Sequence, residues 1–193
     1  METQETTRLS PKDYLVRERA AAYRSEYRCG EMVALAGTSE PHNRIIVNIA
    51  RELSIRLRGM PCKPYVTDLR VRVSDTGLYT YPDALVVCGK AEFIDDHTDT
   101  LTNPAVIFEV LSPSTEAYDR GEKFSHYRRL HSLRDYVLVA QDRCGIEHYT
   151  RQAGNLWLMR SIDQLGDGLD IATIGCSIPV ADIYEDVTLS ADN

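Results

Sequence analysis

The stretch PAVIFEVL, residues 104–111, is apolar throughout except for Glu109. An apolar run of that length predicts a strand that is covered on both faces of a sheet. A second run of this kind, ALVVC at residues 84–88, follows directly after Asp83. Because side chains alternate along a strand, each carboxylate shares a face with apolar neighbours. These two strands decide the fold, and each is associated with an acid where burial is expected.

Asp83 and Glu109 need compensation if their strands are buried. A carboxylate that loses its hydration is costly unless a cation or several hydrogen-bond donors replace the water. If the two strands are neighbours, both acids can reach one hard cation, and Mg²⁺ prefers oxygen ligands while it keeps several waters. The sequence also allows a simpler arrangement, in which one acid ends its strand in solvent and the other pairs with an arginine.

The segment from Asp119 to about residue 130 predicts a helix, because Asp119 and Glu122 have the spacing of a capping box. At roughly 100° per residue, Lys123 falls within the inward arc of this helix. That arc also holds Phe124, Tyr127 and Leu130. An ammonium aimed at the core needs an anionic partner, and Asp83 and Glu109 are the candidates. The alternative is a lysine whose stem lies along the core while its ammonium reaches water.

The rest of the chain predicts further helices and strands. Ser10 and Pro11 begin a helix over residues 12–25. Thr38 or Ser39 caps a longer helix, whose apolar residues recur at a period near 3.6 before it ends at residues 59–61. Strands and hairpins are expected over residues 26–36, 65–73, 79–88, 105–111, 136–140, 146–151 and 156–160. The tail gives no clear pattern. This order predicts an α/β fold with a mixed central β-sheet flanked by α-helices.

Length and composition favour one domain over residues 1–193, with an amino-terminal helix at about 11–25 and a core at about 38–160. Hydrophobic residues make up 43% of the chain, which is enough for a core. No apolar run approaches the roughly 18 residues that span a bilayer. The first residues, METQETTRLSPKDY, are polar and do not resemble a signal peptide. We therefore expect a cytoplasmic protein with no membrane partner.

The five cysteines lie far apart and form no C-x-x-C pair. This spacing argues against a zinc cluster and against a disulfide framework. We expect reduced thiols, with Cys88 in the core.

One segment is strongly basic although the chain has a net charge of −7. That net charge argues against a protein that coats nucleic acid, but a local basic strip can still bind it. Phosphate contacts are expected from Arg120, Arg128, Arg129 and Arg134. A solvated helix face would explain the same arginines.

Several motifs resemble those of a known family. They are YPD at residues 81–83, EVLSPST at 109–115, YDRGEK at 118–123, Tyr127, YRCGE at 27–31 and HN at 42–43. Over about residues 14–186 the sequence is similar to the Uma-two family, which belongs to the PD-(D/E)XK restriction-endonuclease-like superfamily. The short PD motif is weak on its own, whereas the block from Glu109 to Lys123 is specific.

The resemblance implies a restriction-endonuclease-like core and Mg²⁺-dependent (or Mn²⁺-dependent) hydrolysis of phosphodiester bonds in DNA. It assigns Asp83, Glu109 and the carbonyl of Val110 to the metal. In the simplest superfamily pattern a lysine stands two residues after the glutamate, where this chain has Leu111. Lys123 then resembles a migrated lysine that the following helix delivers. Because many relatives by fold cut both strands of a duplex, we also expect a homodimer.

Four further residues are candidates for supporting roles. Glu31 could reach the site from the amino-terminal hairpin, or it could be a solvated turn residue. His42 could orient a phosphate or a carboxylate, or it could be satisfied within the first turn of its helix. Asp119 has a sufficient role as an N-cap, and Tyr127 could direct its hydroxyl toward the acids or serve only in packing.

Two other functions stay open at this point. Leu111 and the acidic net charge would also suit a catalytically silent nucleic-acid-binding or regulatory protein that keeps the nuclease fold. A metal hydrolase acting on a small phosphoester would need a closed pocket in place of an open basic groove.

Overall fold

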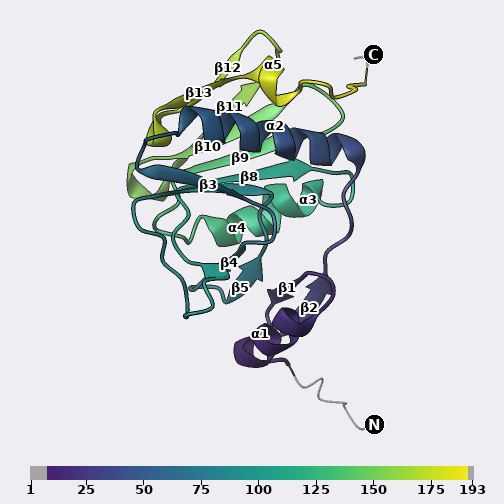
Figure 1. The fold of residues 1–193 in the computed structure, drawn as a ribbon, viewed down its shortest axis with the longest axis vertical. Helices are drawn as coiled ribbons and strands as arrows, with labels where there is room; N and C mark the ends of the chain where they lie inside the picture. Colours follow the sequence, from purple (N-terminus) through teal and green to yellow (C-terminus); the bar gives the residue numbers. More distant parts are fainter. Residues whose placement is uncertain (1–7, 191–193) are drawn as a thin grey trace.

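The computed structural model describes residues 8–190. Residues 1–7, where we expect no signal peptide, and the last three residues of the tail lie outside that range. Figure 1 shows helix α2 on one side of the central sheet, α3 and α4 on the other, and α1 with β1 and β2 at the far end. Within the described residues, no helix has the length and apolar character that crossing a membrane requires.

The central sheet has six strands and is mixed. In spatial order they are β11 (Trp157–Ile162), β10 (Ile146–Arg151), β9 (Asp135–Ala140), β8 (Val106–Leu111), β6 (Ala84–Cys88) and β3 (Cys62–Val66). β8 and β9 are parallel, while the other neighbours are antiparallel. All six residues of β8 are buried, which confirms the strand covered on both faces. The predicted fold class is confirmed.

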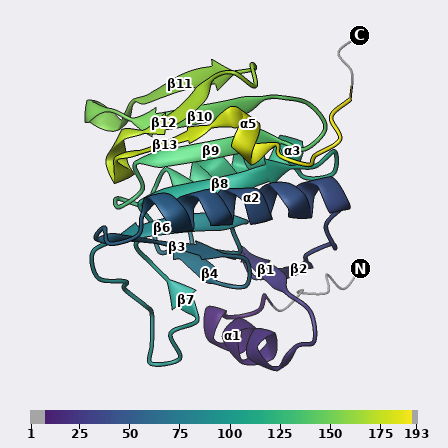
Figure 2. The ribbon, with the colours of Figure 1, turned by 45° about the horizontal axis from the view of Figure 1, so that its top comes forward.

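One face of this sheet is covered by α2 (Glu40–Arg56). Ser39 caps this helix by accepting a hydrogen bond from the His42 N–H at 3.4 Å, as its sequence predicts. The tail, which gave no pattern, packs on the same side (Figure 2). It forms β12 (Gly168–Ile171), the short helix η3 (Ala172–Ile174), β13 (Cys176–Pro179) and α5 (Val180–Ile183). The Asn48 amide ties α2 to this tail by donating to the carbonyls of Ile183 and Glu185.

The other face is covered by a five-stranded sheet and by the segment that carries Lys123. In spatial order that sheet contains β2 (Glu31–Ala34), β1 (Ser25–Arg28), β5 (Leu78–Thr80), β4 (Arg70–Val73) and β7 (Thr100–Leu101). The predicted hairpins at 26–36 and at 146–160 are confirmed, the second turning through the short helix η2 (Ala153–Asn155).

Two predicted strands are each divided between the two sheets. The stretch 65–73 breaks at Thr67 and Asp68, whose φ angles of 29° and 57° lie outside the strand region. The stretch 79–88 breaks at Pro82, which has no N–H to donate to a ladder. In both cases the first half and the second half join different sheets. Asp83 therefore lies immediately before β6 and not inside a strand.

The predicted capping role of Asp119 is wrong. The helical segment begins earlier, as α3 (Glu116–Tyr118), continues as the π-helical turn η1 (Asp119–Lys123) and ends as α4 (Phe124–Tyr127). The Asp119 N–H donates to the Thr115 carbonyl at 2.9 Å, so Asp119 lies inside a helical segment that has already begun and does not cap its start. π-Helical turns inside helices occur frequently at functional sites.

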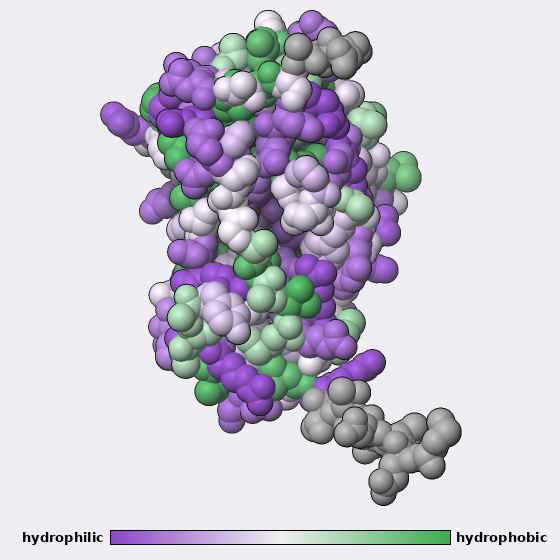
Figure 3. All heavy atoms as spheres, turned by 90° about the vertical axis from the view of Figure 1, so that its right-hand side faces the viewer, coloured by the Kyte–Doolittle hydropathy of each residue, from purple (hydrophilic) through white to green (hydrophobic). Residues whose placement is uncertain are grey.

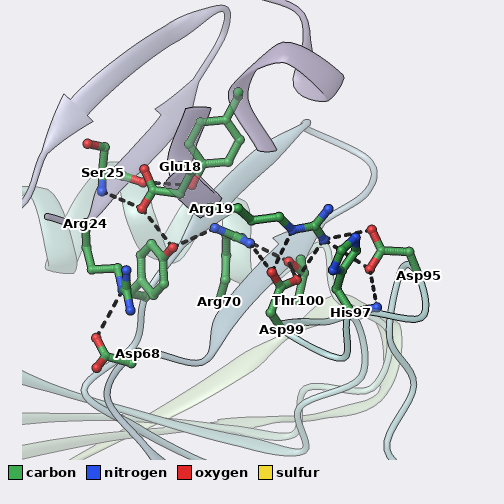
Figure 4. A network of polar contacts seen from close by, with 12 residues as sticks. Glu18, Arg19, Arg24, Ser25, Asp68, Arg70, Asp95, His97, Asp99 and Thr100 are labelled. Atoms are coloured by element: carbon green, nitrogen blue, oxygen red, sulfur yellow. Dashed lines mark hydrogen bonds and ion pairs between the residues drawn. The ribbon is translucent and has the colours of Figure 1, made fainter. Parts of the chain in front are cut away.

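Helix α1 (Pro11–Ala20) is shorter than predicted, although its Ser10 cap is confirmed. A polar network fixes it to the rest of the fold (Figure 4). The Arg19 guanidinium binds Asp95 and Asp99, each at 2.7 Å, and Arg70 binds Asp99 at 3.0 Å. Glu18 accepts from the Ser25 N–H at 2.8 Å, at the start of β1. Charged partners on α1, β4 and the loop before β7 therefore hold the amino-terminal hairpin in place.

The expectation of reduced thiols is wrong for two of the cysteines. Cys62 and Cys88 form a disulfide. The two residues are 26 positions apart in sequence, but the antiparallel pairing of β3 with β6 places them directly opposite each other. Cys88 is half-buried at the edge of the core, while Cys29 and Cys176 remain thiols.

Candidate active site

A cavity of about 360 Å³ lies between the amino-terminal hairpin, the start of α2 and the ends of β6 and β8. Its walls include Asp83, Glu109 and Lys123, together with the predicted supporting residues His42 and Asp119. The face drawn in Figure 3 is hollowed at mid-height, between mostly hydrophilic side chains. Sequence positions separated by more than 80 residues thus contribute to one site.

Asp83 lies immediately before β6, and Glu109 lies within the neighbouring strand β8, so the two acids are close to each other as the metal hypothesis requires. β6 pairs with β8 so that Ala84 is opposite Phe108, and one further step of this antiparallel register brings Asp83 opposite Glu109. The Val110 N–H donates to Asp83 Oδ2 at 2.7 Å. His42 Nε2 lies 3.2 Å from Asp83 Oδ1. Two contacts from different elements therefore fix the Asp83 carboxylate at the cavity wall.

The Lys123 side chain points toward the sheet and is 7% exposed. Its Nζ lies 2.8 Å from Glu109 Oε1, 3.3 Å from Asp119 Oδ1 and 3.8 Å from Glu26 Oε1. This geometry confirms the inward orientation predicted from the helical projection, and it does not fit a lysine that reaches solvent. The π-helical turn places Asp119 and Lys123, four residues apart, on the same side.

Tyr127 is fully buried, and its hydroxyl donates to Glu109 Oε1 at 2.8 Å. Lys123 and Tyr127 thus both contact the same oxygen of Glu109. Two roles were open for Tyr127, packing alone or a hydroxyl directed toward the acids. The structure has the second, because the hydroxyl contacts Glu109.

Of the two alternatives for Glu31, the structure has the solvated one, and another glutamate of the hairpin lies at the cavity. Glu31 lies exposed on the edge strand β2 and does not line the cavity. Glu26, on β1, is 1% exposed and lines it. Its carboxylate accepts hydrogen bonds from Arg28, Thr80 and Tyr118, the last at 3.2 Å. Alternation along SEYR places Glu26 and Arg28 on one face, but the local sequence does not reveal which hairpin strand becomes the inner one.

The protonation of these acids reflects their burial. Burial raises the pKa of Glu109 well above its usual range, the charges of Asp119 and Asp83 act in the same direction, and Lys123 opposes them. Burial likewise raises the pKa of Asp119. Burial would lower the pKa of Lys123, but Glu109, Asp119 and Glu26 outweigh it and raise that pKa well above its usual range. Lys123 is therefore held as a cation.

The pKa of Glu26 is shifted in the opposite direction, below its usual value. Burial disfavours its charge, but Lys123, the Thr80 hydroxyl and Arg28 outweigh this effect and lower its pKa. Four Asp and Glu side chains line the cavity, against two Lys and Arg side chains, and a further cation would offset this excess of acids. Hard oxygen donors are also the ligands that Mg²⁺ prefers. Because no group of three or more Asp, Glu, His or Cys side chains in residues 8–190 could hold a metal ion, such a cation would depend on two carboxylates with water and main-chain oxygens.

The four arginines predicted to contact phosphates do not line this cavity. Arg120 forms ion pairs with Glu116, at 2.9 Å, and with Glu147. Arg128, Arg129 and Arg134 are exposed on the segment after Lys123. The predicted basic edge is therefore a separate surface.

A sequence profile described as "Putative restriction endonuclease" matches residues 11–181, which is most of the chain. The chain belongs to the Uma2 family. This is the Uma-two family whose motifs include Asp83, Glu109 and Lys123, and the structure brings these three Uma2 residues together in one cavity.

Two similar proteins come from Synechocystis sp. (strain ATCC 27184 / PCC 6803 / Kazusa). "Uncharacterized protein slr1290" is 36% identical over 177 residues, which cover 92% of each chain. "Uncharacterized protein sll1609" is 33% identical over 163 residues, which cover 84% of this chain and 91% of the relative. The Uma2 chain thus matches nearly the whole length of both relatives.

The fold also matches a crystal structure from Anabaena variabilis ATCC 29413, described as a putative nuclease belonging to DUF820. The TM-score is 0.75 at 15% sequence identity, and the match covers 91% of this chain and 97% of the other. At that identity the likeness shows a shared fold.

We predict that Lys123→Met lowers the free energy of unfolding by about 3–5 kcal/mol, because it leaves buried carboxylates without their cation. The double variant Lys123→Met/Glu109→Gln should be less destabilised than the sum of the single variants, since the amide needs no counter-ion. Urea unfolding measures both effects, with the exposed Lys63→Met as the matched control. An unchanged stability in Lys123→Met would contradict the buried ion pair.

We also predict that Glu109 makes stability fall with rising pH. The pKa of Glu109 is higher in the folded protein than its usual 4.5, so unfolding releases a proton and a higher pH favours the unfolded chain. The stability of the wild type relative to Glu109→Gln should therefore decline as the pH rises above 4.5. Urea titrations on both sides of this pH test it, with the exposed Glu31→Gln as control. Parallel pH profiles would show that Glu109 is not perturbed.

Proposed function

We propose that this Uma2 protein is a metal-dependent endonuclease that hydrolyses phosphodiester bonds in DNA. The observation that carries the proposal is the convergence of Asp83, Glu109 and Lys123 on one surface cavity, with the lysine ammonium 2.8 Å from Glu109. The family description and the shared fold support a nuclease. The geometry adds a set of groups that can perform the reaction.

The donors at the cavity fit a divalent cation of the Mg²⁺ or Mn²⁺ type. Asp83 and Glu109 offer carboxylate oxygens, and by resemblance to the superfamily the Val110 carbonyl offers a third donor. When bound, such a cation supplies positive charge and acidifies water next to the phosphate. His42 and the Val110 N–H orient the Asp83 carboxylate.

Lys123 would act through its ammonium. Three carboxylates hold it charged at the cavity wall, where it can donate a hydrogen bond to a phosphate oxygen or orient the attacking water. Charge stabilisation by a preorganised donor of this kind is usually a large term in catalysis. Tyr127 would keep Glu109 in place through its 2.8 Å hydrogen bond.

Leu111 favours catalysis over the silent alternative when its surroundings are considered. Leu111 is 4% exposed and belongs to the apolar cluster that includes Tyr136 and Leu138. A lysine at that position would enter an apolar core, whereas Lys123 reaches Glu109 from the following helix. The ammonium is therefore supplied by Lys123 on the following helix and not by a residue two positions after Glu109.

We further propose that the chain acts as one nuclease-like domain and as a homodimer. The amino-terminal hairpin supplies Glu26 to the same cavity as β6 and β8, which supports one functional unit. The dimer is inferred from relatives by fold that cut both strands of a duplex.

A cleavage assay tests the proposal. Purified protein is incubated with plasmid and with single-stranded DNA, in Mg²⁺, in Mn²⁺ and in chelator. We predict cutting only with metal, and a loss of about 100-fold or more in rate for Asp83→Asn and for Lys123→Met, because each removes preorganised charge from the site. The matched control Glu31→Gln, an exposed acid outside the cavity, should cut normally. Equal cutting by Asp83→Asn would contradict the proposed site.

A further inference from the structure

A second cavity, of about 260 Å³, lies where α4 ends beside the β10–β11 hairpin. Its lining includes four basic side chains, Arg128, Arg129, His131 and Arg151. It also includes one acid, Asp75, and the ring of Trp157. It shares no lining residue with the candidate active site. This cationic cavity is a separate feature that the proposed chemistry does not use.

Arg151 lines the cationic cavity, and several contacts hold its guanidinium in place. Its Nε donates to the Leu133 carbonyl at 2.8 Å, and its Nη2 donates to the carbonyls of Arg128 and Leu130 at 2.7 and 2.9 Å. Its guanidinium also lies 4.6 Å from the centre of the Trp157 ring. Because Arg151 holds three carbonyls of the turn after α4, it fixes the backbone on which the other cations are displayed.

Within residues 8–190, no acid forms an ion pair with the displayed arginines. Arg128 and Arg129 are exposed, and neither forms an ion pair with any described residue. Arg120, a few residues earlier, contrasts with them because two glutamates bind it. Burial lowers the pKa of Arg151, and the charge of Arg134 lowers it further. Positive charge thus accumulates here, although the chain as a whole has a net charge of −7.

Guanidinium groups match phosphate in shape and charge, since they donate parallel hydrogen bonds and are always protonated. The positive surface extends beyond the cavity to Arg134, which is more than a single free phosphate needs. The cationic cavity lies where β10 ends and β11 begins, whereas the candidate active site lies where β8 ends. Phosphates bound here would therefore lie outside the cleavage site.

We propose that the cationic cavity binds backbone phosphates of a nucleic-acid strand outside the cleavage site. Contacts of this kind are independent of sequence and position a substrate without reading its bases. The choice of a nucleic-acid strand as the ligand rests on the proposed nuclease function, whereas the binding of phosphate rests on the cavity itself.

Binding of short labelled duplex and single-stranded DNA is measured by anisotropy in chelator, where cleavage does not interfere. The variant is Arg128→Gln/Arg129→Gln, and the matched control is Arg17→Gln/Arg58→Gln, which removes the same charge from exposed positions elsewhere. Because each lost phosphate contact reduces the slope of log K against log salt by about 0.9 in duplex DNA, two contacts amount to roughly 30-fold in affinity at 0.15 M salt. The control should keep the wild-type slope.

Three outcomes decide the matter. A weaker affinity with a reduced slope in the cavity variant alone supports the proposal. Equal affinities and slopes in all three proteins overturn it. Displacement of a dye-labelled tripolyphosphate from the cavity, with DNA affinity unchanged in the variant, also overturns it and assigns the cavity to a free phosphate compound. None of these binding measurements depends on cleavage. A protein that binds DNA through this cavity but never cleaves it would therefore contradict the proposed nuclease function and leave the proposed phosphate site intact.

Discussion

The ion pair between Lys123 and Glu109 is the interaction on which the site depends. A buried carboxylate that lacks a cation is strongly destabilising, and here three carboxylates share one ammonium within 3.8 Å. Burial raises the pKa of Glu109 well above its usual range, whereas Lys123, Thr80 and Arg28 together lower the pKa of Glu26. This shortage of positive charge makes the cavity receptive to a metal ion.

The scaffold brings the acids together through contacts from several elements around the cavity. Glu18 and Tyr81 are hydrogen-bonded at 2.9 Å, so α1 is tied to the residue that stands two positions before Asp83. The same helix holds the start of β1, which carries Glu26. On the opposite side of the cavity, the start of α2 supplies His42. Packing and polar contacts at several elements thus determine the position of one carboxylate.

Much of this site could be predicted because the decisive signals are local. Glu109 stands out because it interrupts an apolar run, and the inward position of Lys123 follows from its phase relative to Tyr127, which does not depend on where the helix begins. Glu26 and the Cys62–Cys88 disulfide could not be found in this way. Both depend on which strand pairs with which, and pairing between strands distant in sequence is not encoded in a short window.

The central claim is that Asp83 and Glu109 together hold a divalent cation, and locating Mn²⁺ by anomalous diffraction tests it most directly. In crystals grown with Mn²⁺, we expect an anomalous peak about 2 Å from oxygens of both carboxylates, the distance typical of small divalent cations. The peak should be lost in Asp83→Asn. A peak at another place, or none at a Mn²⁺ concentration that supports DNA cleavage, would contradict the account.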